Sequence, residues 1–185
     1  MGQKFTELNK LHIQFIEQQQ MFFVATAASQ GRVNLSPKGL DSFRIYSPNQ
    51  VAWLSVTGSG NETAAHLLEN PRMTIMFCAF VGKPVILRLY GEAKAYYPRD
   101  KQWQTYAQHF EILSGTRQIF VMNVDLVQTS CGMAVPLFEC TGQRTELVEW
   151  AENQGESGIE EYWRKKNQLS IDDMPTGLFE GSVEK

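Results

Sequence analysis

The hydrophobic residues of this chain fall mainly into short runs separated by turn residues, a pattern typical of β-strands. Gly31 lies between the first two runs and predicts a two-stranded hairpin, because glycine tolerates the backbone angles of a tight turn. The third run contains a Ser-Pro-Asn turn before its most apolar part, and residues 81–83 form a further turn. The expected strands cover residues 21–29, 33–39, 43–56, 73–80, 84–98 and 117–132.

Other segments carry the periodicity of helices. Apolar residues recur at spacings of three and four near the N-terminus and predict an amphipathic helix over residues 5–19. Residues 61–70 predict a short helix that ends before Pro71, because proline disfavours the helical conformation in the residue before it. Two more helices are expected over residues 99–110 and 145–167, the second interrupted at Gly155 and Gly158.

The order of these elements predicts the fold class. About six strands follow one another with hairpin-like connections, which favours an antiparallel sheet over a doubly wound parallel one. We therefore expect a mainly β (α+β) protein, built as a small closed antiparallel barrel with flanking helices. Residues 1–144 are expected to form this domain, and residues 145–185 a C-terminal helix and irregular tail that pack on it.

Composition and charge narrow the functional classes only slightly. The chain has 185 residues, 43% of them hydrophobic, and a net charge of -3, which gives no reason to expect nucleic acid or an anionic membrane as partner. Its three cysteines form no CxxC pair, so we expect a reducing, cytoplasmic setting. The N-terminus lacks the apolar core of a signal peptide, and no apolar run approaches the length of a membrane span.

Nucleophilic catalysis and metal binding find little support in the sequence. Cys131 stands in "TSCGMAVP", but no signature joins it to His12, His66 or His109, and a structural cysteine is the simpler interpretation. The three histidines are far apart in the sequence and show no HxH or HxxxH spacing, so no metal site is expected. For His66 we expect a capping or packing role within the helix over residues 61–70.

An anion site is the more informative possibility. Lys38 ends the second expected strand, and the stretch "TGSGN" leads into the helix that opens at Asn61. The first backbone N–H groups of a helix lack partners within it and, with the helix dipole, favour a phosphate. Thr57, Ser59 and Thr63 add hydroxyl donors. Asn61 could instead cap its own helix, and the local residues leave both interpretations open.

Arg88 is a further candidate, because it interrupts the apolar strand "VILRLYG". A buried arginine needs a partner. That partner could be a carboxylate such as Glu92 or Asp125, or it could be an anionic or polar ligand.

These residues resemble the pyridoxamine 5'-phosphate oxidase-like, flavin-binding split β-barrel proteins. The resemblance runs over roughly residues 20 to 132 and rests on three features in order: a strand ending in lysine, a strand–turn–helix ending in Asn-Pro, and a following strand that closes on Gly-x-Ala. It implies a six-stranded antiparallel split β-barrel and a homodimer with FMN at the subunit interface. The cofactor-binding residues that it implies are Ser36, Lys38, Val56, Thr57, Gly60, Asn61, Glu62, Thr63 and Arg88.

The chain departs from the true oxidases at two places. Where they carry an Arg-Lys pair at the helix start, this sequence has Glu62 and Thr63, which leaves Lys38, Arg88 and backbone N–H groups to hold the anion. The end of the chain, "SIDDMPTGLFEG", lacks the arginine that holds pyridoxal phosphate in the true oxidases. Oxidation of vitamin B6 is therefore not expected.

The resemblance implies an FMN-dependent oxidoreductase that acts on an unidentified small substrate. No catalytic residue is assigned, because the flavin supplies the redox chemistry. Two alternatives stay open: a flavin-binding stress or sensor module without turnover, and a split barrel that uses a deazaflavin or haem, for which His66 or His109 would have to supply the axial ligand.

Overall fold

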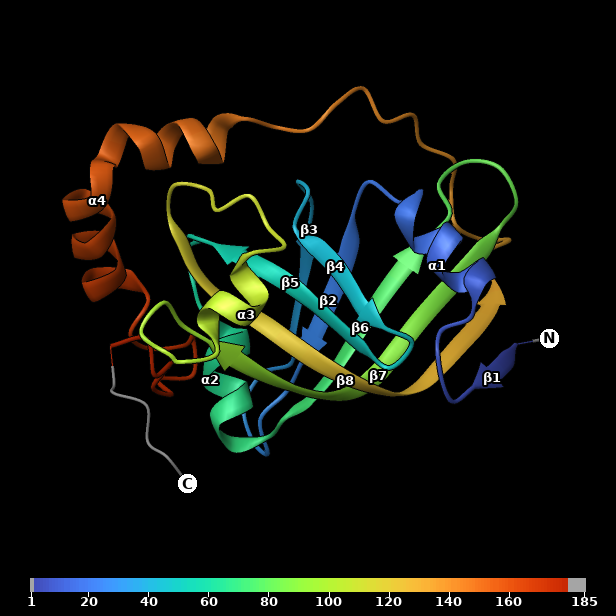
Figure 1. The fold of residues 1–185 in the computed structure, drawn as a ribbon, viewed down its shortest axis with the longest axis horizontal. Helices are drawn as coiled ribbons and strands as arrows, with labels where there is room; N and C mark the ends of the chain where they lie inside the picture. The colour runs from blue at the N-terminus through green and yellow to red at the C-terminus, as the bar shows by residue number, and fades with distance from the viewer. Residues whose placement is uncertain (1, 180–185) are drawn as a thin grey trace.

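The computed structural model describes residues 2–179 as a single sheet flanked by helices (Figure 1). Its strands are β1 (Gln3–Phe5), β2 (Phe22–Thr26), β3 (Asn34–Lys38), β4 (Phe43–Ser47), β5 (Gln50–Val56), β6 (Arg72–Cys78), β7 (Val85–Tyr96) and β8 (Thr116–Cys131). Its helices are α1 (Lys10–Glu17), α2 (Glu62–Glu69), α3 (Trp103–Ala107) and α4 (Glu146–Lys166). Residues 180–185 of the predicted tail lie outside the described residues.

All strand pairs are antiparallel, as the hairpin-like connections predicted. The sheet has eight strands in the order β3-β2-β6-β7-β8-β5-β4, and β1 pairs with β8 beside this path. The prediction of six strands was wrong, because residues 43–56 divide into β4 and β5 at the Ser-Pro-Asn turn and residues 3–5 add β1. The prediction of a closed barrel was also wrong: within the described residues, the outer strands β3 and β4 do not pair with each other.

The N-terminal helix is shorter than its periodicity predicted. It begins at Lys10, and the Asn9 side chain caps it by accepting a hydrogen bond of 3.0 Å from the backbone N–H of His12. Phe5 belongs to β1 and reaches the His12 ring, with 4.6 Å between ring centroids. The apolar residues before Asn9 therefore lie in an extended segment, although their spacing fits a helix.

Two hydrophobic clusters lie on opposite faces of β5 and β8. Trp53 of β5 stacks on Phe120 of β8 in the larger cluster, with ring centroids 4.5 Å apart. The neighbouring β5 residues Ala52 and Leu54 belong to the smaller cluster, which α3 covers. Because both faces of β5 are buried, the position of its end at Val56 is fixed, and so is the start of the loop that leads to α2.

Helix α2 connects β5 to β6 and packs on β2. His66 is buried in this contact, with 3.0 Å between its Nδ1 and the Thr26 hydroxyl. The helix ends at Glu69, one residue before Asn-Pro, as predicted. His66 therefore serves helix packing, in agreement with its expected role.

No helix among the described residues has both the length and the apolar character that a membrane crossing requires.

The Gly-x-Ala pattern marks a close approach of two backbones. The pairing of β7 with β8 shifts register between Tyr90 and Gly91. A Cβ on Gly91 would overlap the carbonyl oxygen of Asn123 and lie 2.9 Å from its carbonyl carbon. Ala93, two residues later, is buried. Only glycine fits the first position of this pattern without moving β8.

Gly91→Ala is expected to lower the free energy of unfolding by about 2 to 4 kcal/mol, because backbone atoms of β8 cannot move aside as a side chain would. Gly82→Ala is the control. Gly82 has a φ of +71° and open space around it. The loss of stability in Gly82→Ala should therefore reflect backbone strain alone, about 1 kcal/mol. Urea denaturation of both variants measures the difference, and equal losses would contradict the steric explanation.

Candidate cofactor site

A cavity of about 980 Å³ opens where β3 and β5 end and α2 begins. Its lining includes the loop over residues 57–61 and the aromatic residues Phe23, Phe80 and Phe138, which are partly or largely exposed, whereas Trp53 and Phe120 lie behind the surface in the core. This volume is in the range of pockets that hold cofactors and other small molecules. The cavity lies at the part of the fold where the sequence placed the anion site.

The structure brings together all the sequence-predicted site residues except one. Those that line the cavity are Ser36, Lys38, Val56, Thr57, Gly60, Asn61, Glu62 and Thr63. Arg88 does not line it, and its Nη1 instead donates a hydrogen bond of 3.1 Å to the Ser130 hydroxyl. Among residues 2–179, Arg88 shows no ion pair with a carboxylate, and β8 supplies its hydrogen-bond partner.

Lys38 supplies one positive charge to the cavity. Its ammonium lies over the Trp53 ring, 4.9 Å from the centroid. The pKa of Lys38 is lowered to about 8, mainly by burial and also by the nearby Arg117, while Glu62 opposes the change. The lysine is therefore held in a place that disfavours its charge unless an anion is close by.

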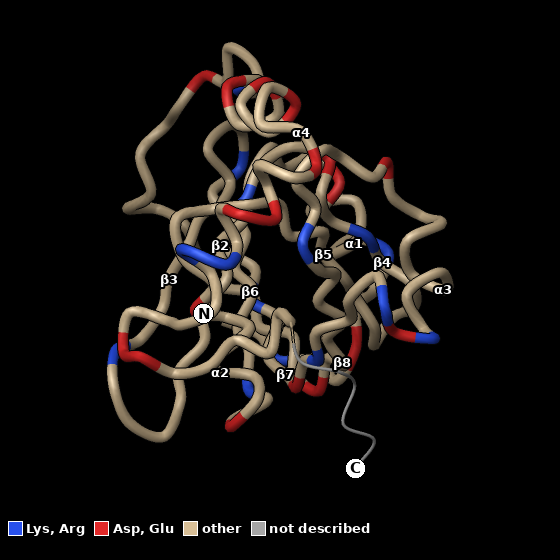
Figure 2. Tube along the Cα trace, turned by 90° about the vertical axis from the view of Figure 1, so that its left-hand side faces the viewer, with Lys and Arg blue, Asp and Glu red and all other residues tan. Residues whose placement is uncertain are grey.

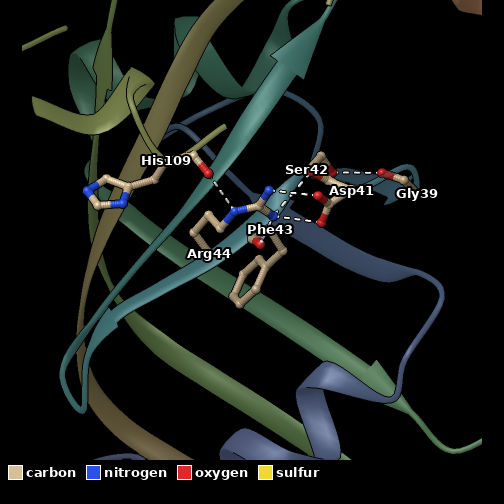
Figure 3. Close-up of polar contacts among 6 residues, drawn as sticks. All are labelled: Gly39, Asp41, Ser42, Phe43, Arg44 and His109. Carbon is tan, nitrogen blue, oxygen red and sulfur yellow. Dashed lines mark hydrogen bonds and ion pairs between the residues drawn. The ribbon is translucent and has the colours of Figure 1, made fainter. Parts of the chain in front are cut away.

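The turn after Lys38 is fixed by Arg44, as Figure 3 shows. The Arg44 guanidinium holds both carboxylate oxygens of Asp41 at 2.7 Å, and its Nε donates to the His109 carbonyl oxygen at 2.7 Å. The Ser42 hydroxyl donates to the Gly39 carbonyl oxygen at 2.7 Å. These bonds hold the segment that follows β3, and with it the position of Lys38.

Arg117 supplies a second positive charge, which the sequence analysis missed. It is only 5% exposed, and its Nη1 donates to the Gly60 carbonyl oxygen at 2.8 Å and to Asn167 Oδ1 at 2.9 Å. Burial lowers the pKa of Arg117 to about 10, opposed first by Glu62. Like Arg88, Arg117 stands in an apolar strand, in "TRQIF", and so needs a partner; this is the signal in the sequence that points to it.

Asn61 does not cap its own helix, so the capping interpretation of this residue was wrong. The described structure shows no capping bond from its side chain. Its Oδ1 instead accepts a hydrogen bond of 2.7 Å from Gln118 Nε2. The first backbone N–H groups of α2 are thus without a side-chain cap and available to an anion.

The two threonine hydroxyls have partners within the protein. Thr57 Oγ1 donates to the Gly115 carbonyl oxygen at 2.7 Å and accepts from Trp163 Nε1 at 2.7 Å. Thr63 Oγ1 accepts from Asn34 Nδ2 at 3.1 Å. Thr57 therefore has no proton left to donate to an anion, and its hydroxyl joins the loop before α2 to α4.

The end of α4 holds the cavity loop in place. Asn167, which caps α4 and is fully buried, donates through Nδ2 to the Gly58 carbonyl oxygen at 3.1 Å and accepts from Arg117 through Oδ1. With the bond from Trp163 to Thr57, this gives α4 two attachments to one loop. Helix α4 changes direction at Gly155, which has a φ of +64°.

Residues 132–145, between β8 and α4, form one side of the cavity without regular secondary structure. Phe138 N donates to the Phe80 carbonyl oxygen at 3.0 Å. Gln143 accepts from the backbone N–H of Leu40 and donates to the Gln20 carbonyl oxygen, both at 3.0 Å. This segment, which we call the border segment, is thus attached to the rest of the protein at Phe138 and at Gln143.

The remaining candidates for chemistry lie elsewhere. Neither His66 nor His109 lines the cavity, and Cys131 is an exposed residue outside its lining. No cluster of metal-ligating side chains occurs among residues 2–179. Figure 2 shows basic and acidic residues interspersed along the trace.

Comparison with known proteins identifies the family. The chain matches the family model for pyridoxamine 5'-phosphate oxidase over residues 8–131. It is 37% identical over 187 residues to the pyridoxamine 5'-phosphate oxidase family protein ustO of Aspergillus flavus, a match that covers 90% of this chain and 74% of that protein. The chain therefore belongs to the pyridoxamine 5'-phosphate oxidase family, as its motifs indicated.

Solved structures share the fold at low identity. HupZ from Group A Streptococcus superposes with a TM-score of 0.51 and 18% identity, over 64% of this chain and 91% of its own. A candidate pyridoxamine 5'-phosphate oxidase from Lactobacillus delbrueckii gives a TM-score of 0.52 and 13% identity, over 66% of this chain and 94% of its own. At these identities the likeness shows the fold alone.

Asn167→Ala is expected to lower the free energy of unfolding by about 2 kcal/mol, because it removes the partner of a buried guanidinium and of the Gly58 carbonyl. The control is Gln168→Ala at the adjacent exposed position, which should have little effect. Thermal and urea denaturation measure both. An Asn167→Ala variant as stable as the control would show that α4 does not support the loop.

Lys38→Met is expected to raise the free energy of unfolding of the ligand-free protein at pH 7 by about 1 to 2 kcal/mol, because it removes a partly buried charge. In the wild type, stability should rise with pH from about 8 to 10.5, where the unfolded chain keeps a proton that folded Lys38 has released. The variant should lack this rise. Lys94→Met is the control, since Lys94 is exposed and also lies over an aromatic ring, that of Tyr96.

Proposed function

We propose that this protein binds FMN in the cavity and acts as a flavin-dependent oxidoreductase on a small substrate. The observation that carries the proposal is the meeting of Lys38, Arg117 and the uncapped start of α2 at one cavity with aromatic walls. Two cations and free backbone N–H groups suit a phosphate, and the aromatic walls suit a planar ring. Membership of the pyridoxamine 5'-phosphate oxidase family supports the same ligand.

Unsatisfied donors around the cavity fit such a ligand. Trp53 Nε1, Asn61 Nδ2 and Arg117 Nε are buried and have no acceptor among the described residues, and all three residues line the cavity. A buried donor without a partner costs free energy. A ligand rich in acceptors, such as a flavin with its carbonyl and phosphate oxygens, could satisfy donors here after small side-chain adjustments.

The roles of the residues follow from their chemistry. Lys38, Arg117 and the first N–H groups of α2 would hold the phosphate, and Phe80 and Phe138 would contact the apolar parts of the ligand. When bound, the flavin supplies the electron transfer, and the protein binds it, orients it and limits its exposure to water. The histidines named for a haem alternative lie outside the lining, which favours a flavin over haem.

We also propose the homodimer that the family resemblance implied, with the cofactor at the interface. Support comes from the rim of the cavity, where the apolar residues Val81 and Phe138 are 70% and 60% exposed. Exposed apolar side chains around a binding site are typical of a surface that a partner covers. Sedimentation of the protein with and without FMN measures the oligomeric state.

FMN titration of the purified protein, followed by quenching of flavin fluorescence, tests the proposed ligand. Lys38→Met should weaken FMN binding at least about tenfold, because a charge-assisted contact to phosphate is lost. Lys94→Met should bind like the wild type. Arg88→Met should also bind FMN like the wild type, because Arg88 does not line the cavity. A weaker affinity of Arg88→Met for FMN would show that Arg88 contributes to the site. Protein that binds no FMN would contradict the proposal.

Turnover distinguishes the enzyme from a flavin-binding module. Steady-state oxidation of NADH or NADPH with an electron acceptor should depend on bound FMN. Tight FMN retention with no turnover for any donor tested would favour the module.

A further inference from the structure

A carboxylate lies among the cations of the cavity. Glu62 is the first residue of α2 and lines the cavity together with Lys38 and Arg117. Its side chain folds back over the preceding loop, where a Cβ on Gly60 would overlap Oε1 and lie 2.6 Å from Oε2. The Gly60 carbonyl oxygen in turn accepts a hydrogen bond from Arg117. The carboxylate is therefore placed beside the loop and helix start that would receive a phosphate.

The charges of the neighbours show that Glu62 acts on both of them. It opposes the lowering of the pKa of Lys38 and of Arg117, so it stabilises the charged form of each. The charged lining residues are Lys38, Arg117 and Arg144 on one side and Glu62 and Glu139 on the other, which leaves the cavity with one net positive charge. A phosphate monoester brings about two negative charges near neutral pH. Binding it beside Glu62 therefore adds repulsion that a ligand without phosphate avoids.

We infer that Glu62 determines the ligand specificity of this cavity by acting as an internal anion that competes with the phosphate of a flavin. This inference rests on the proposed function, since it concerns the same site. The wild-type protein discriminates weakly between FMN and riboflavin, which differ only in the phosphate. The phosphate then contributes less to the affinity than its contacts with Lys38, Arg117 and the start of α2 would give without Glu62. The ligand class is a flavin for which phosphorylation is of secondary importance.

A purely structural role for Glu62 predicts a different result. An acidic residue in the first turn stabilises a helix through its dipole, by a modest amount. If that were its whole role, Glu62→Gln would lower stability and leave ligand preference unchanged. If Glu62 competes with phosphate, the same variant loses a little stability and gains phosphate affinity. The two effects have opposite signs and are measured separately.

The experiment compares wild type, Glu62→Gln and Glu92→Gln, the last being an exposed carboxylate outside the cavity lining. Dissociation constants for FMN and riboflavin come from fluorescence quenching. Glu62→Gln should increase the preference for FMN over riboflavin by about tenfold, equivalent to about 1.4 kcal/mol. Riboflavin affinity should change little, and Glu92→Gln should keep the wild-type preference. Glu62→Asp, which retains the charge, should show no comparable gain and serves if the glutamine variant folds poorly.

Thermal denaturation in increasing inorganic phosphate provides a readout that needs no flavin. Glu62→Gln should gain more stability from phosphate than wild type or Glu92→Gln. If FMN binds but neither the preference nor the phosphate effect changes, the role of Glu62 is overturned and the flavin site stands. If no flavin binds but phosphate stabilises Glu62→Gln selectively, the proposed function fails and the role of Glu62 as a competing anion stands. If neither flavin nor phosphate binds any variant, both are overturned.

Discussion

The buried guanidinium of Arg117 is the interaction on which the cavity depends. A charge with 5% exposure is tolerated only with partners, and its partners come from different parts of the chain: the Gly60 carbonyl in the loop before α2 and the Asn167 side chain at the end of α4. Arg117 thus joins β8, the loop and the C-terminal helix around one charge. Because Asn167 also holds Gly58, the backbone at the helix start and the cation beside it are positioned together.

The cavity contains both cationic side chains and a carboxylate that lies close to them. Lys38 and Arg117 are both held where burial disfavours their charge, and Glu62 offsets part of that cost within the empty protein. A carboxylate that stabilises the ligand-free state also reduces the favourable electrostatic energy that an anion would gain on binding. The charge balance of the cavity therefore favours the charged forms of Lys38 and Arg117 in the protein without ligand.

The sequence predicted local structure well where short-range chemistry decides it. The hairpin at Gly31, the end of α2 before Asn-Pro and the long final strand all follow from turn residues and apolar runs. The sequence did not predict structure that depends on contacts between distant residues. Strand β1 forms because it pairs with β8, 120 and more residues away. The sheet is open because its outer strands β3 and β4 do not pair with each other within the described residues. In the cavity, the family motif indicated Lys38 and the start of α2. Arg117 was missed because its partner Asn167 lies 50 residues further along the chain, at the end of the predicted C-terminal helix, to which no part in the site was assigned.

The border segment has a consequence for the way this family can diversify. Its residues line the cavity, yet it carries no strand or helix and is tied to the rest of the protein near Phe138 and Gln143. Substitutions or insertions between those two ties would alter the cavity wall without disturbing sheet pairing or the phosphate-side residues. Changes in the border segment could thus alter which molecules fit the cavity, while the strands and the helix start that form its other side stay in place.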